Sequence, residues 1–299
     1  MEPFSEDILS PPLLDPGEWE GVRTLWIGAV CTVEEIRLRP IGQLAVLKHM
    51  HPEHRADPGI AARCVNEGLI LQFLQQEGGG IHVPTLLAMG VLPNGCPALI
   101  LAPLGESLAD VLDGETLSSD RENTSVSLLL RVGIDLAEAL GFVHARGVVH
   151  RDVRPENILF ARRTCKKPSS LGSPAHLVDF GLAKVFRPGL FLPVSTGNDD
   201  ILGTDLYMAP EQWETAKHVS GAADVYSLGV VLYRLASGRP PFLDPRRQVL
   251  MYQHLVTPPP ALPNTLPPTL SRLIFAMLSK RAKDRPTASE CARTLVALR

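Results

Sequence analysis

The segment that decides the fold reads His150-Arg151-Asp152-Val153-Arg154-Pro155-Glu156-Asn157, and Asp179-Phe180-Gly181 follows it further along the chain. Each segment comes after an apolar run and concentrates polar and charged side chains within a few residues. Three shorter motifs continue the order toward the C-terminus: Gly203-Thr204 with Tyr207-Met208-Ala209-Pro210-Glu211, then Asp224 within Asp-Val-Tyr-Ser-Leu-Gly, then Arg285-Pro286. Five motifs in one order are far more specific than a single glycine-rich motif.

The chain before these motifs is rich in predicted strands. Short apolar runs between Leu25 and Met50 alternate with polar residues and turn signals, which favours hairpin strands. A helix is predicted over 61–76, where apolar residues recur at four-residue spacing and glycines follow. A further strand is predicted over 98–102. Residues 1–18 show neither the periodicity of a helix nor that of a strand, and we expect a flexible leader there.

The chain after Leu104 is predicted to be mainly helical. A helix over 125–146 carries an apolar stripe and ends at Gly147. Further helices are predicted over 222–236 and 269–280, and the last helix opens at Thr287 with Glu290 as its capping partner. The chain is therefore strand-rich first and helix-rich afterwards, which indicates the α+β class.

The composition excludes several classes of protein. A chain of 299 residues with 45% hydrophobic and 20% charged residues is globular, and its net charge of -3 gives no basic field for nucleic acid or anionic lipid. No apolar run reaches the roughly 20 residues that a membrane span needs. The five cysteines are odd in number and widely spaced, which indicates neither a Cys-x-x-Cys metal site nor a disulfide framework. The first ten residues carry acids and no Lys or Arg, unlike a secretory signal, so we expect a cytoplasmic protein.

Together the five motifs resemble those of the eukaryotic-like (Hanks-type) serine/threonine protein kinases. The resemblance implies a bilobal protein kinase fold, with a small strand-rich N-lobe over 19–103 and a larger helical C-lobe over 104–299. It also implies transfer of the γ-phosphate of ATP to Ser or Thr of a protein substrate, with Mg²⁺ or Mn²⁺ as the metal. The excess of Arg over Lys, 22 against 7, is typical of a GC-rich, bacterial genome.

The resemblance assigns chemical roles to four residues of the two acidic loops. Phosphoryl transfer depends on positioning and on neutralising spread negative charge. Asp152 is the implied base that orients the attacking hydroxyl, and Arg154 is the cation that neutralises the transferred phosphate. Asn157 and Asp179 are the implied Mg²⁺ ligands, since both offer hard oxygen atoms. Arg154 stands where the family usually has Lys, and its planar guanidinium changes the geometry of approach.

Other motif residues have implied supporting roles. Thr204 is assigned to the catalytic machinery and, with the Arg154-Pro155 pair, is similar to serine/threonine rather than tyrosine kinases. Glu211 and Arg285 are expected to form an ion pair that braces the larger lobe. Asp224 is expected to hold the backbone amides of the catalytic loop.

Lys48 resembles the strand lysine that grips the nucleotide phosphates, and Glu67 is its expected helical partner. Lys48 is the only lysine among the first 165 residues, which hold twelve arginines, so the choice of Lys there is suggestive. The remaining nucleotide contacts that the resemblance implies come from a set of mostly apolar residues: Ile27, Gly28, Val33, Ala45, Leu101, Leu104 and Leu159.

The sequence departs from the family at the loop that should cover the phosphates. Ile27-Gly28-Ala29-Val30-Cys31-Thr32-Val33 stands there, and only one glycine survives. Glycine lets backbone amides approach phosphate without a side chain in the way. We therefore expect a stiffer, poorer phosphate cradle and weak ATP binding.

The segment that joins the two predicted lobes allows two registers. In the first, Leu101 is the gatekeeper beside the adenine site and the Leu104 amide meets adenine. In the second, Ile100 is the gatekeeper and Pro103, which has no N–H, occupies the donor position. The first register is preferred.

Three functions from different classes remain open at this point. The first is an active serine/threonine protein kinase regulated by another protein. The second is a pseudokinase, a scaffold or binding protein whose degenerate phosphate loop limits turnover. The third, a small-molecule kinase, has no need of the Ala209-Pro210-Glu211, Asp224 and Arg285 set and ranks last.

Overall fold

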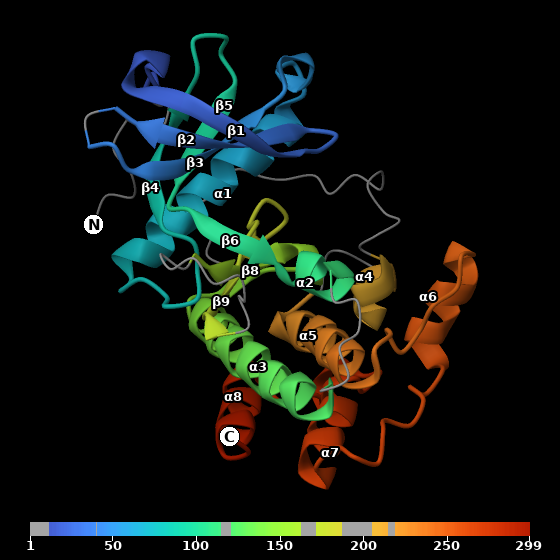
Figure 1. Ribbon diagram of the computed structural model, residues 1–299. Coiled ribbons are helices and arrows are strands. Elements are labelled where there is room, and N and C mark those ends of the chain that lie inside the picture. Colours follow the sequence, from blue (N-terminus) through green and yellow to red (C-terminus); the bar gives the residue numbers. More distant parts are fainter. Residues whose placement is uncertain (1–11, 40, 115–120, 163–171, 187–204, 215–218) are drawn as a thin grey trace. The chain divides into compact units, whose positions relative to one another are not determined.

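The computed structural model describes residues 12–39, 41–114, 121–162, 172–186, 205–214 and 219–299 (Figure 1). The chain divides into two compact units. The first unit contains residues 1–104 and 180–195, and the second contains residues 105–179 and 196–299. Over the described ranges, no helix combines the length and the apolar character needed to cross a membrane.

The first unit is built on a five-stranded antiparallel sheet in the order β1-β2-β3-β5-β4. The strands are β1 (Trp19–Ile27), β2 (Cys31–Leu38), β3 (Leu44–Met50), β4 (Leu86–Val91) and β5 (Pro97–Leu101). A two-residue strand, β10 (Lys184–Val185), lies in the second segment of this unit. The hairpins and the strand predicted from the sequence are therefore present.

Helix α1 (Pro58–Gln76) packs against β4 and β5 of this sheet (Figure 1). It begins three residues before the predicted start because Asp57 caps it, with its carboxylate accepting from the N–H groups of Gly59 and Ile60. Pro58 fits the first helical position, where no N–H is needed. The helix is followed by Gly78 and Gly79, whose φ angles are positive, as the predicted glycine stop requires.

The flexible leader predicted over 1–18 does not extend to its last residues. Leu14 is buried with Trp19 in the core cluster on one face of the sheet, and its N–H donates to the carbonyl of Val91 at 2.8 Å. A short 3-10 helix follows at Pro16–Glu18. The order of Leu14 could not be predicted from the local sequence, because the contacts that fix it come from β4, far along the chain.

The second unit is mainly helical. Its helices are α2 (Leu108–Gly114), α3 (Arg121–Ala145), α4 (Pro210–Glu214), α5 (Gly221–Ser237), α6 (Arg247–Val256), α7 (Pro268–Met277) and α8 (Ala288–Val296). The strand β6 (Leu104–Ser107) pairs with β8 (Ile158–Ala161), which pairs with β9 (Ala175–Leu177). The short strand β7 is Val148–Val149.

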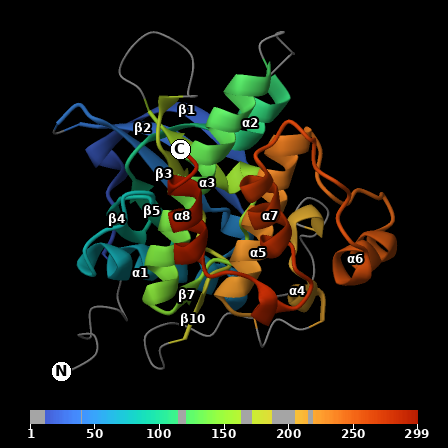
Figure 2. The ribbon, with the colours of Figure 1, turned by 90° about the horizontal axis from the view of Figure 1, so that it is seen from below.

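Buried helices α3 and α5 form the centre of the second unit. Helix α3 packs against both α5 and α8, and α5 packs against α7 (Figure 2). Gly147 follows α3 with φ of 75°, as predicted for a left-handed stop. Thr287 and Glu290 form the predicted capping box of α8. These local signals explain why the helix boundaries were predicted to within a few residues.

The ion pair predicted between Glu211 and Arg285 is confirmed. Two guanidinium nitrogens of Arg285 donate to the two carboxylate oxygens of Glu211 at 2.7 and 2.8 Å. The same guanidinium also donates to the carbonyls of Ala222, Ser279 and Lys280. Its side chain is fully buried, and the many acceptors offset the cost of removing this charge from water.

Arg285→Ala is expected to lower the free energy of unfolding by about 3–5 kcal/mol, because it leaves the Glu211 carboxylate and three carbonyls without their donor. Urea unfolding of the purified chain measures this change. The matched control is Arg281→Ala, which breaks the exposed pair with Asp284 and is expected to cost no more than about 1 kcal/mol. Equal, small effects of both substitutions would contradict the structural role given to Arg285.

Candidate active site

The segment that begins at His150 is held in place by Asp224, which lies in the first turn of α5. Its two carboxylate oxygens accept from the backbone N–H groups of His150 and Arg151, at 2.8 and 2.7 Å. The Nε2 atom of His144 lies 2.8 Å from Oδ2. Burial by itself raises the pKa of Asp224, but the hydrogen bond and charge of His144 and the loop amide outweigh it, and the pKa is lowered. The role predicted for Asp224 is confirmed.

The His150 side chain joins this loop to the residue that precedes Asp179. Its Nε2 lies 3.0 Å from the carbonyl oxygen of Val178, and because a carbonyl only accepts, Nε2 carries the proton and donates. Nδ1 accepts from the N–H of Asp152 at 3.3 Å. Complete burial lowers the pKa of His150, which keeps the ring neutral, as this bonding requires. The sequence analysis assigned no role to this side chain.

Asp152 and Asn157 are arranged so that each keeps one oxygen for another partner. The Nδ2 atom of Asn157 donates to the backbone oxygen of Asp152 at 2.9 Å and to its Oδ2 at 2.8 Å. Both amide protons are therefore used, and Oδ1 of Asn157 is an oxygen that could hold a metal. The Oδ1 atom of Asp152 is buried and has no hydrogen-bond partner. This oxygen therefore keeps its capacity to accept a hydrogen bond.

The electrostatics of Asp152 differ from those of an ordinary aspartate. Burial raises its pKa to about 6; the charge of Arg154 acts against this rise, whereas the negative charge of Asp179 adds to it. Asp152 and Asp179 both belong to the second unit and are close enough to influence each other. The Asp179 carboxylate and the Asn157 amide oxygen are hard oxygen ligands that could hold Mg²⁺ or Mn²⁺ beside Asp152.

Backbone strain marks the same two loops. Arg151 has φ of 68° and Asp179 has φ of 66°, and these are the only non-glycine residues with positive φ among those that the structure describes. A left-handed conformation costs an L-residue roughly 1–2 kcal/mol. Such strain persists only where the surroundings fix it, and it clusters at functional sites. The hydrogen bond from the Arg151 N–H to Asp224 is part of what fixes it here.

Arg154 and Gln212 make further hydrogen bonds to residues in and around the loop that begins at His150. Arg154 donates through Nε to the carboxylate of Glu156 at 2.8 Å. Gln212 of α4 donates to the carbonyl of Arg151 at 3.0 Å and accepts from the N–H of Ala209 at 3.0 Å. Gln212 therefore ties the loop to the Ala209-Pro210-Glu211 motif. Gln212 was not predicted as a site residue, although it directly follows that motif in the sequence.

The first unit contains the predicted pair of Lys48 and Glu67. Lys48 Nζ donates to Glu67 Oε2 at 2.7 Å, and the two side chains are 14% and 3% exposed. Helix α1 lies close to the sheet because Gly68 has no side chain: a Cβ there would lie 2.8 Å from the Leu99 side chain. The close approach brings Glu67 to the strand that carries Lys48. The ammonium group is thus held at a fixed point on one face of the sheet.

The register of the sheet decides which predicted nucleotide contacts share a face with Lys48. Val33 and Leu99 pair directly with Lys48, and Leu101 pairs with Val46 two residues away, so all of these lie on its face. Ile100 points to the opposite face, into the core cluster around Leu14 and Trp19. The first of the two registers, with Leu101 as gatekeeper, agrees with this alternation.

The same alternation corrects the prediction for Ala45. Ala45 is fully buried in the core cluster on the face opposite Lys48, so it cannot line a site beside the ammonium group. Side chains alternate along a strand, and Ala45 is an odd number of residues from Lys48. Val46, two residues before Lys48, is the residue of β3 that shares its face. The alternation could have been applied to the sequence.

The turn between β1 and β2 replaces the expected phosphate loop. It is a tight hairpin turn in which the N–H of Gly28 donates to the carbonyl of Cys31 at 3.0 Å. The Trp26 indole lies over Gly28: a Cβ on Gly28 would come within 1.8 Å of it. Trp26 pairs with Val33, so its side chain is on the Lys48 face of the sheet. The space that the surviving glycine opens is therefore filled by Trp26.

The remaining residues predicted to contact the nucleotide have no strand pairing with Lys48 that would place them on its face. Ile27 is 69% exposed at the end of β1. Leu104 begins β6, and Leu159 in β8 alternates with the buried residues Ile158 and Phe160. Thr204 lies outside the residues that the structure describes.

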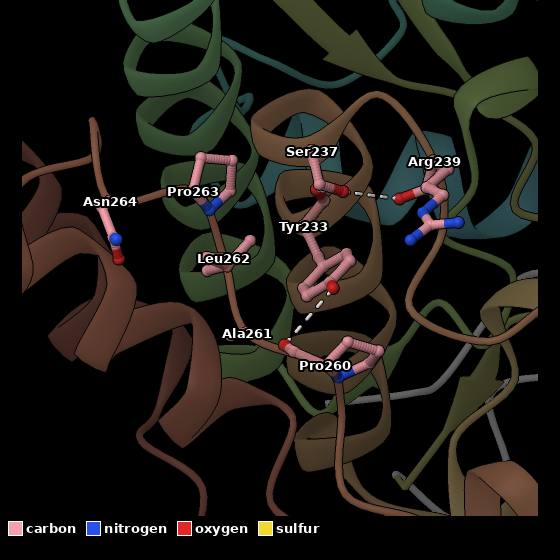
Figure 3. Close-up of a pocket in the computed structure, with 8 residues that line it drawn as sticks. All are labelled: Tyr233, Ser237, Arg239, Pro260, Ala261, Leu262, Pro263 and Asn264. Carbon is pink, nitrogen blue, oxygen red and sulfur yellow. Dashed lines mark hydrogen bonds between the residues drawn. The ribbon is translucent and has the colours of Figure 1, made fainter.

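The proline-rich segment after Pro258 has a structural role in the second unit. It lines a hollow of about 400 Å³ with the end of α5 (Figure 3). The hydroxyl of Tyr233 donates to the carbonyl of Pro260 at 3.3 Å. The residues that line the hollow are Tyr233, Ser237, Arg239, Pro260, Ala261, Leu262, Pro263 and Asn264, none of which was predicted as a site residue. This hollow is therefore separate from the acidic loops.

Comparisons with known proteins agree with the motifs. Residues 19–296 match the family described as "Protein kinase domain". The chain is 33% identical over 280 residues to serine/threonine-protein kinase pkn2 of Myxococcus xanthus, covering 91% of this chain and 31% of pkn2. It is 39% identical over 274 residues to PknA of Mycobacterium tuberculosis, covering 90% of this chain and 58% of PknA. It is 34% identical over 264 residues to PkaA of Streptomyces coelicolor, covering 85% of this chain and 43% of PkaA. The alignments thus span between about a third and three fifths of these relatives.

The raised pKa of Asp152 predicts a pH-dependent effect of Asp152→Asn on stability in Mg²⁺-free buffer. An ionised Asp152 is disfavoured in the folded chain, so its contribution to stability is complete below pH 4 and is lost as pH rises through about 6. About 2 pKa units correspond to about 3 kcal/mol. Relative to the wild type, the variant should gain about 3 kcal/mol between pH 4 and pH 8, measured by urea unfolding at both pH values. A difference that stays constant with pH would contradict the burial assigned to this carboxylate.

Proposed function

Because this chain belongs to the protein kinase family, we propose that it transfers the γ-phosphate of ATP to serine or threonine side chains of proteins. The observation that supports this most strongly is the state of Asp152. One of its oxygens is bonded to Asn157, and the other is buried without a partner. A base that accepts or orients the proton of a hydroxyl needs an oxygen that no internal donor occupies.

The proposed metal is Mg²⁺, for which Mn²⁺ can substitute. Asn157 offers Oδ1 and Asp179 offers its carboxylate, and both are hard oxygen ligands. When bound, the metal neutralises charge on the phosphates. The chain's own part is to hold these oxygens in place, through the two hydrogen bonds that Asn157 makes to Asp152 and through the His150 bond to Val178.

The proposed anchor for the ATP phosphates is Lys48. A lysine ammonium is a mobile point charge on a flexible stem, and the carboxylate of Glu67 restricts it to one position. Val33, Val46 and Leu101 lie on the same face of the sheet and are the proposed apolar contacts for the base. Apolar walls with a few fixed polar groups are typical of cofactor sites.

Arg154 is proposed to neutralise the transferred phosphate. Its hydrogen bond to Glu156 orients the guanidinium, and its charge also acts on Asp152. A planar guanidinium donates two parallel hydrogen bonds to phosphate oxygens, which an ammonium does not. The proposed acceptor is a protein rather than a small molecule, since relatives that match most of this chain are named serine/threonine-protein kinases.

The direct test is phosphate transfer from labelled ATP to a mixture of protein acceptors in the presence of Mg²⁺. Asp152→Asn should lower the rate by about 10²–10⁴-fold, the usual contribution of a general base. The control is Asp284→Asn, which removes an exposed carboxylate of a surface ion pair and should leave the rate unchanged. Transfer at the same rate by wild type and Asp152→Asn, or no transfer by the wild type, would refute the proposal and favour a scaffold.

Trp26→Ala should strengthen the binding of Mg²⁺·ATP about three- to tenfold, which is about 0.7–1.4 kcal/mol. The reason is that the indole now lies over Gly28, where backbone and phosphate would otherwise approach. Isothermal titration with a non-hydrolysable ATP analogue measures the change. Leu25→Ala, which removes a neighbouring exposed side chain, is the control and should leave the affinity unchanged. Weaker binding by Trp26→Ala would show instead that the indole contacts the nucleotide.

A further inference from the structure

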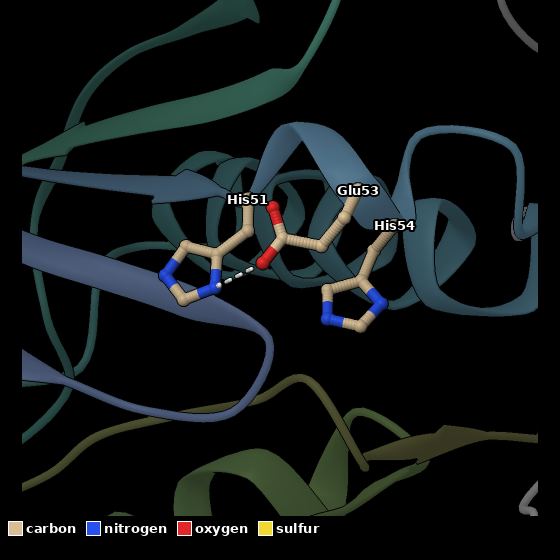
Figure 4. A group of neighbouring side chains, drawn as sticks. All are labelled: His51, Glu53 and His54. Carbon is tan, nitrogen blue, oxygen red and sulfur yellow. Dashed lines mark ion pairs between the residues drawn. The ribbon is translucent and has the colours of Figure 1, made fainter.

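His51, Glu53 and His54 form a compact group at the end of β3 and in the short 3-10 helix Pro52–His54. Figure 4 shows the Glu53 carboxylate between the two imidazole rings. Each residue offers one nitrogen or oxygen atom, and these three atoms lie within 4.8 Å of one another. Nδ1 of His51 is 3.6 Å from Oε1 of Glu53. Ligands of a tetrahedral ion with bonds of about 2.0–2.1 Å are about 3.3 Å apart, so small side-chain shifts close the site.

The ligand types select a class of metal. Two imidazoles and one carboxylate suit Zn²⁺ and similar transition-metal cations, with water completing the coordination. Mg²⁺ prefers a set made only of oxygen atoms, so it does not compete well for two ring nitrogens. The Glu53 side chain is 66% exposed, which gives an ion access from solvent. Within the described residues, this is the group of three His, Cys, Asp or Glu side chains whose ligand atoms lie this close together.

A second interaction orients His51 for this role. Its Nε2 lies 2.8 Å from the Thr32 hydroxyl of β2, while its Nδ1 faces Glu53. Imidazoles that bind metals usually use one nitrogen for the metal and hydrogen-bond through the other, which fixes the tautomer and the ring orientation. Thr32 supplies that second bond. His51 is therefore held in the orientation that a metal ligand requires.

His54 connects the group to the β1–β2 turn. Its Nε2 lies 2.9 Å from the carbonyl oxygen of Ala29, and since a carbonyl only accepts, this nitrogen is the donor. The backbone N–H of His51 also donates to this turn, to the carbonyl of Val30 at 2.9 Å. Ligation of a cation through Nε2 of His54 requires the other neutral tautomer, in which the proton has moved to Nδ1, and it breaks the bond to Ala29. Metal binding and the bond from His54 to the Ala29 carbonyl thus exclude each other.

We propose that His51, Glu53 and His54 bind one divalent transition-metal cation of the Zn²⁺ type, and that the ion frees the Ala29 carbonyl of the β1–β2 turn. His51 contributes Nδ1, Glu53 a carboxylate oxygen and His54 Nε2. The binding step depends only on these residues and on Thr32, whatever reaction the chain catalyses. The simpler alternative is that the three side chains form only an ion pair and hydrogen bonds.

Isothermal titration with Zn²⁺ in a buffer that contains excess Mg²⁺ tests the site, because Mg²⁺ occupies the oxygen-only positions first. The wild type should bind one Zn²⁺ at this site, and Glu53→Gln and His54→Ala should each weaken that binding by more than about tenfold. Thr32→Val should weaken it by about 10–100-fold, the usual cost of losing the bond that orients a ligand. Wild-type affinity in Glu53→Gln and His54→Ala would overturn the proposal.

The matched control is His49→Ala. His49 lies in β3, two residues before His51, and pairs with Glu34 at 3.4 Å. It does not belong to the three-residue group. Zn²⁺ affinity should be unchanged in this variant, and a loss equal to that in His54→Ala would overturn the proposal. A second readout needs no variant: Co²⁺ added to the wild type should show the visible absorption of a four-coordinate ion. A spectrum like that of hydrated Co²⁺ would count equally against the site.

Discussion

The arrangement of the acidic loops depends on one constraint: the buried carboxylate of Asp224 must find hydrogen-bond donors. It finds them in the N–H groups of His150 and Arg151. A buried ionised carboxylate without donors would be costly, so this bonding holds Arg151 in its left-handed conformation. The chain direction that results places Asp152 where one oxygen meets Asn157 and the other has no partner. A structural interaction therefore sets the geometry of the chemical groups.

The first unit holds its functional groups by a different method. Its ammonium group is positioned by an ion pair across a helix and a strand, and the absence of a side chain at Gly68 lets α1 come close enough for that pair. The turn at Gly28–Val30 is held by histidines and filled by an indole, in place of several glycines. A turn held in this way has less freedom to adapt to phosphates than a glycine-rich loop. The loss of glycines in this turn is thus accompanied by contacts from His51, His54 and Trp26 that restrict its backbone.

The main helices could be predicted from the sequence because local signals mark them: apolar spacing, a glycine stop and a capping pair located α1, α5 and α8. The pairs of Lys48 with Glu67 and of Arg285 with Glu211 were predicted from the resemblance of the motifs to those of protein kinases. What could not be predicted depends on contacts between distant segments. The burial of Leu14, the role of His150 and the position of Trp26 over Gly28 all arise from tertiary packing. The assignment of Ala45 was a different kind of error, since the alternation of side chains along a strand already argued for Val46.

We propose that the loop fixed by Asp224 presents Asn157 and Asp179 to a metal and leaves Asp152 for the hydroxyl. A crystal structure of the chain with Mg²⁺ and a non-hydrolysable ATP analogue tests this most directly. We expect Oδ1 of Asn157 and the carboxylate of Asp179 to coordinate Mg²⁺, with the bonds of Asn157 Nδ2 to Asp152 intact. Coordination of the ion by Asp152, or by other residues with Asn157 turned away, would contradict it.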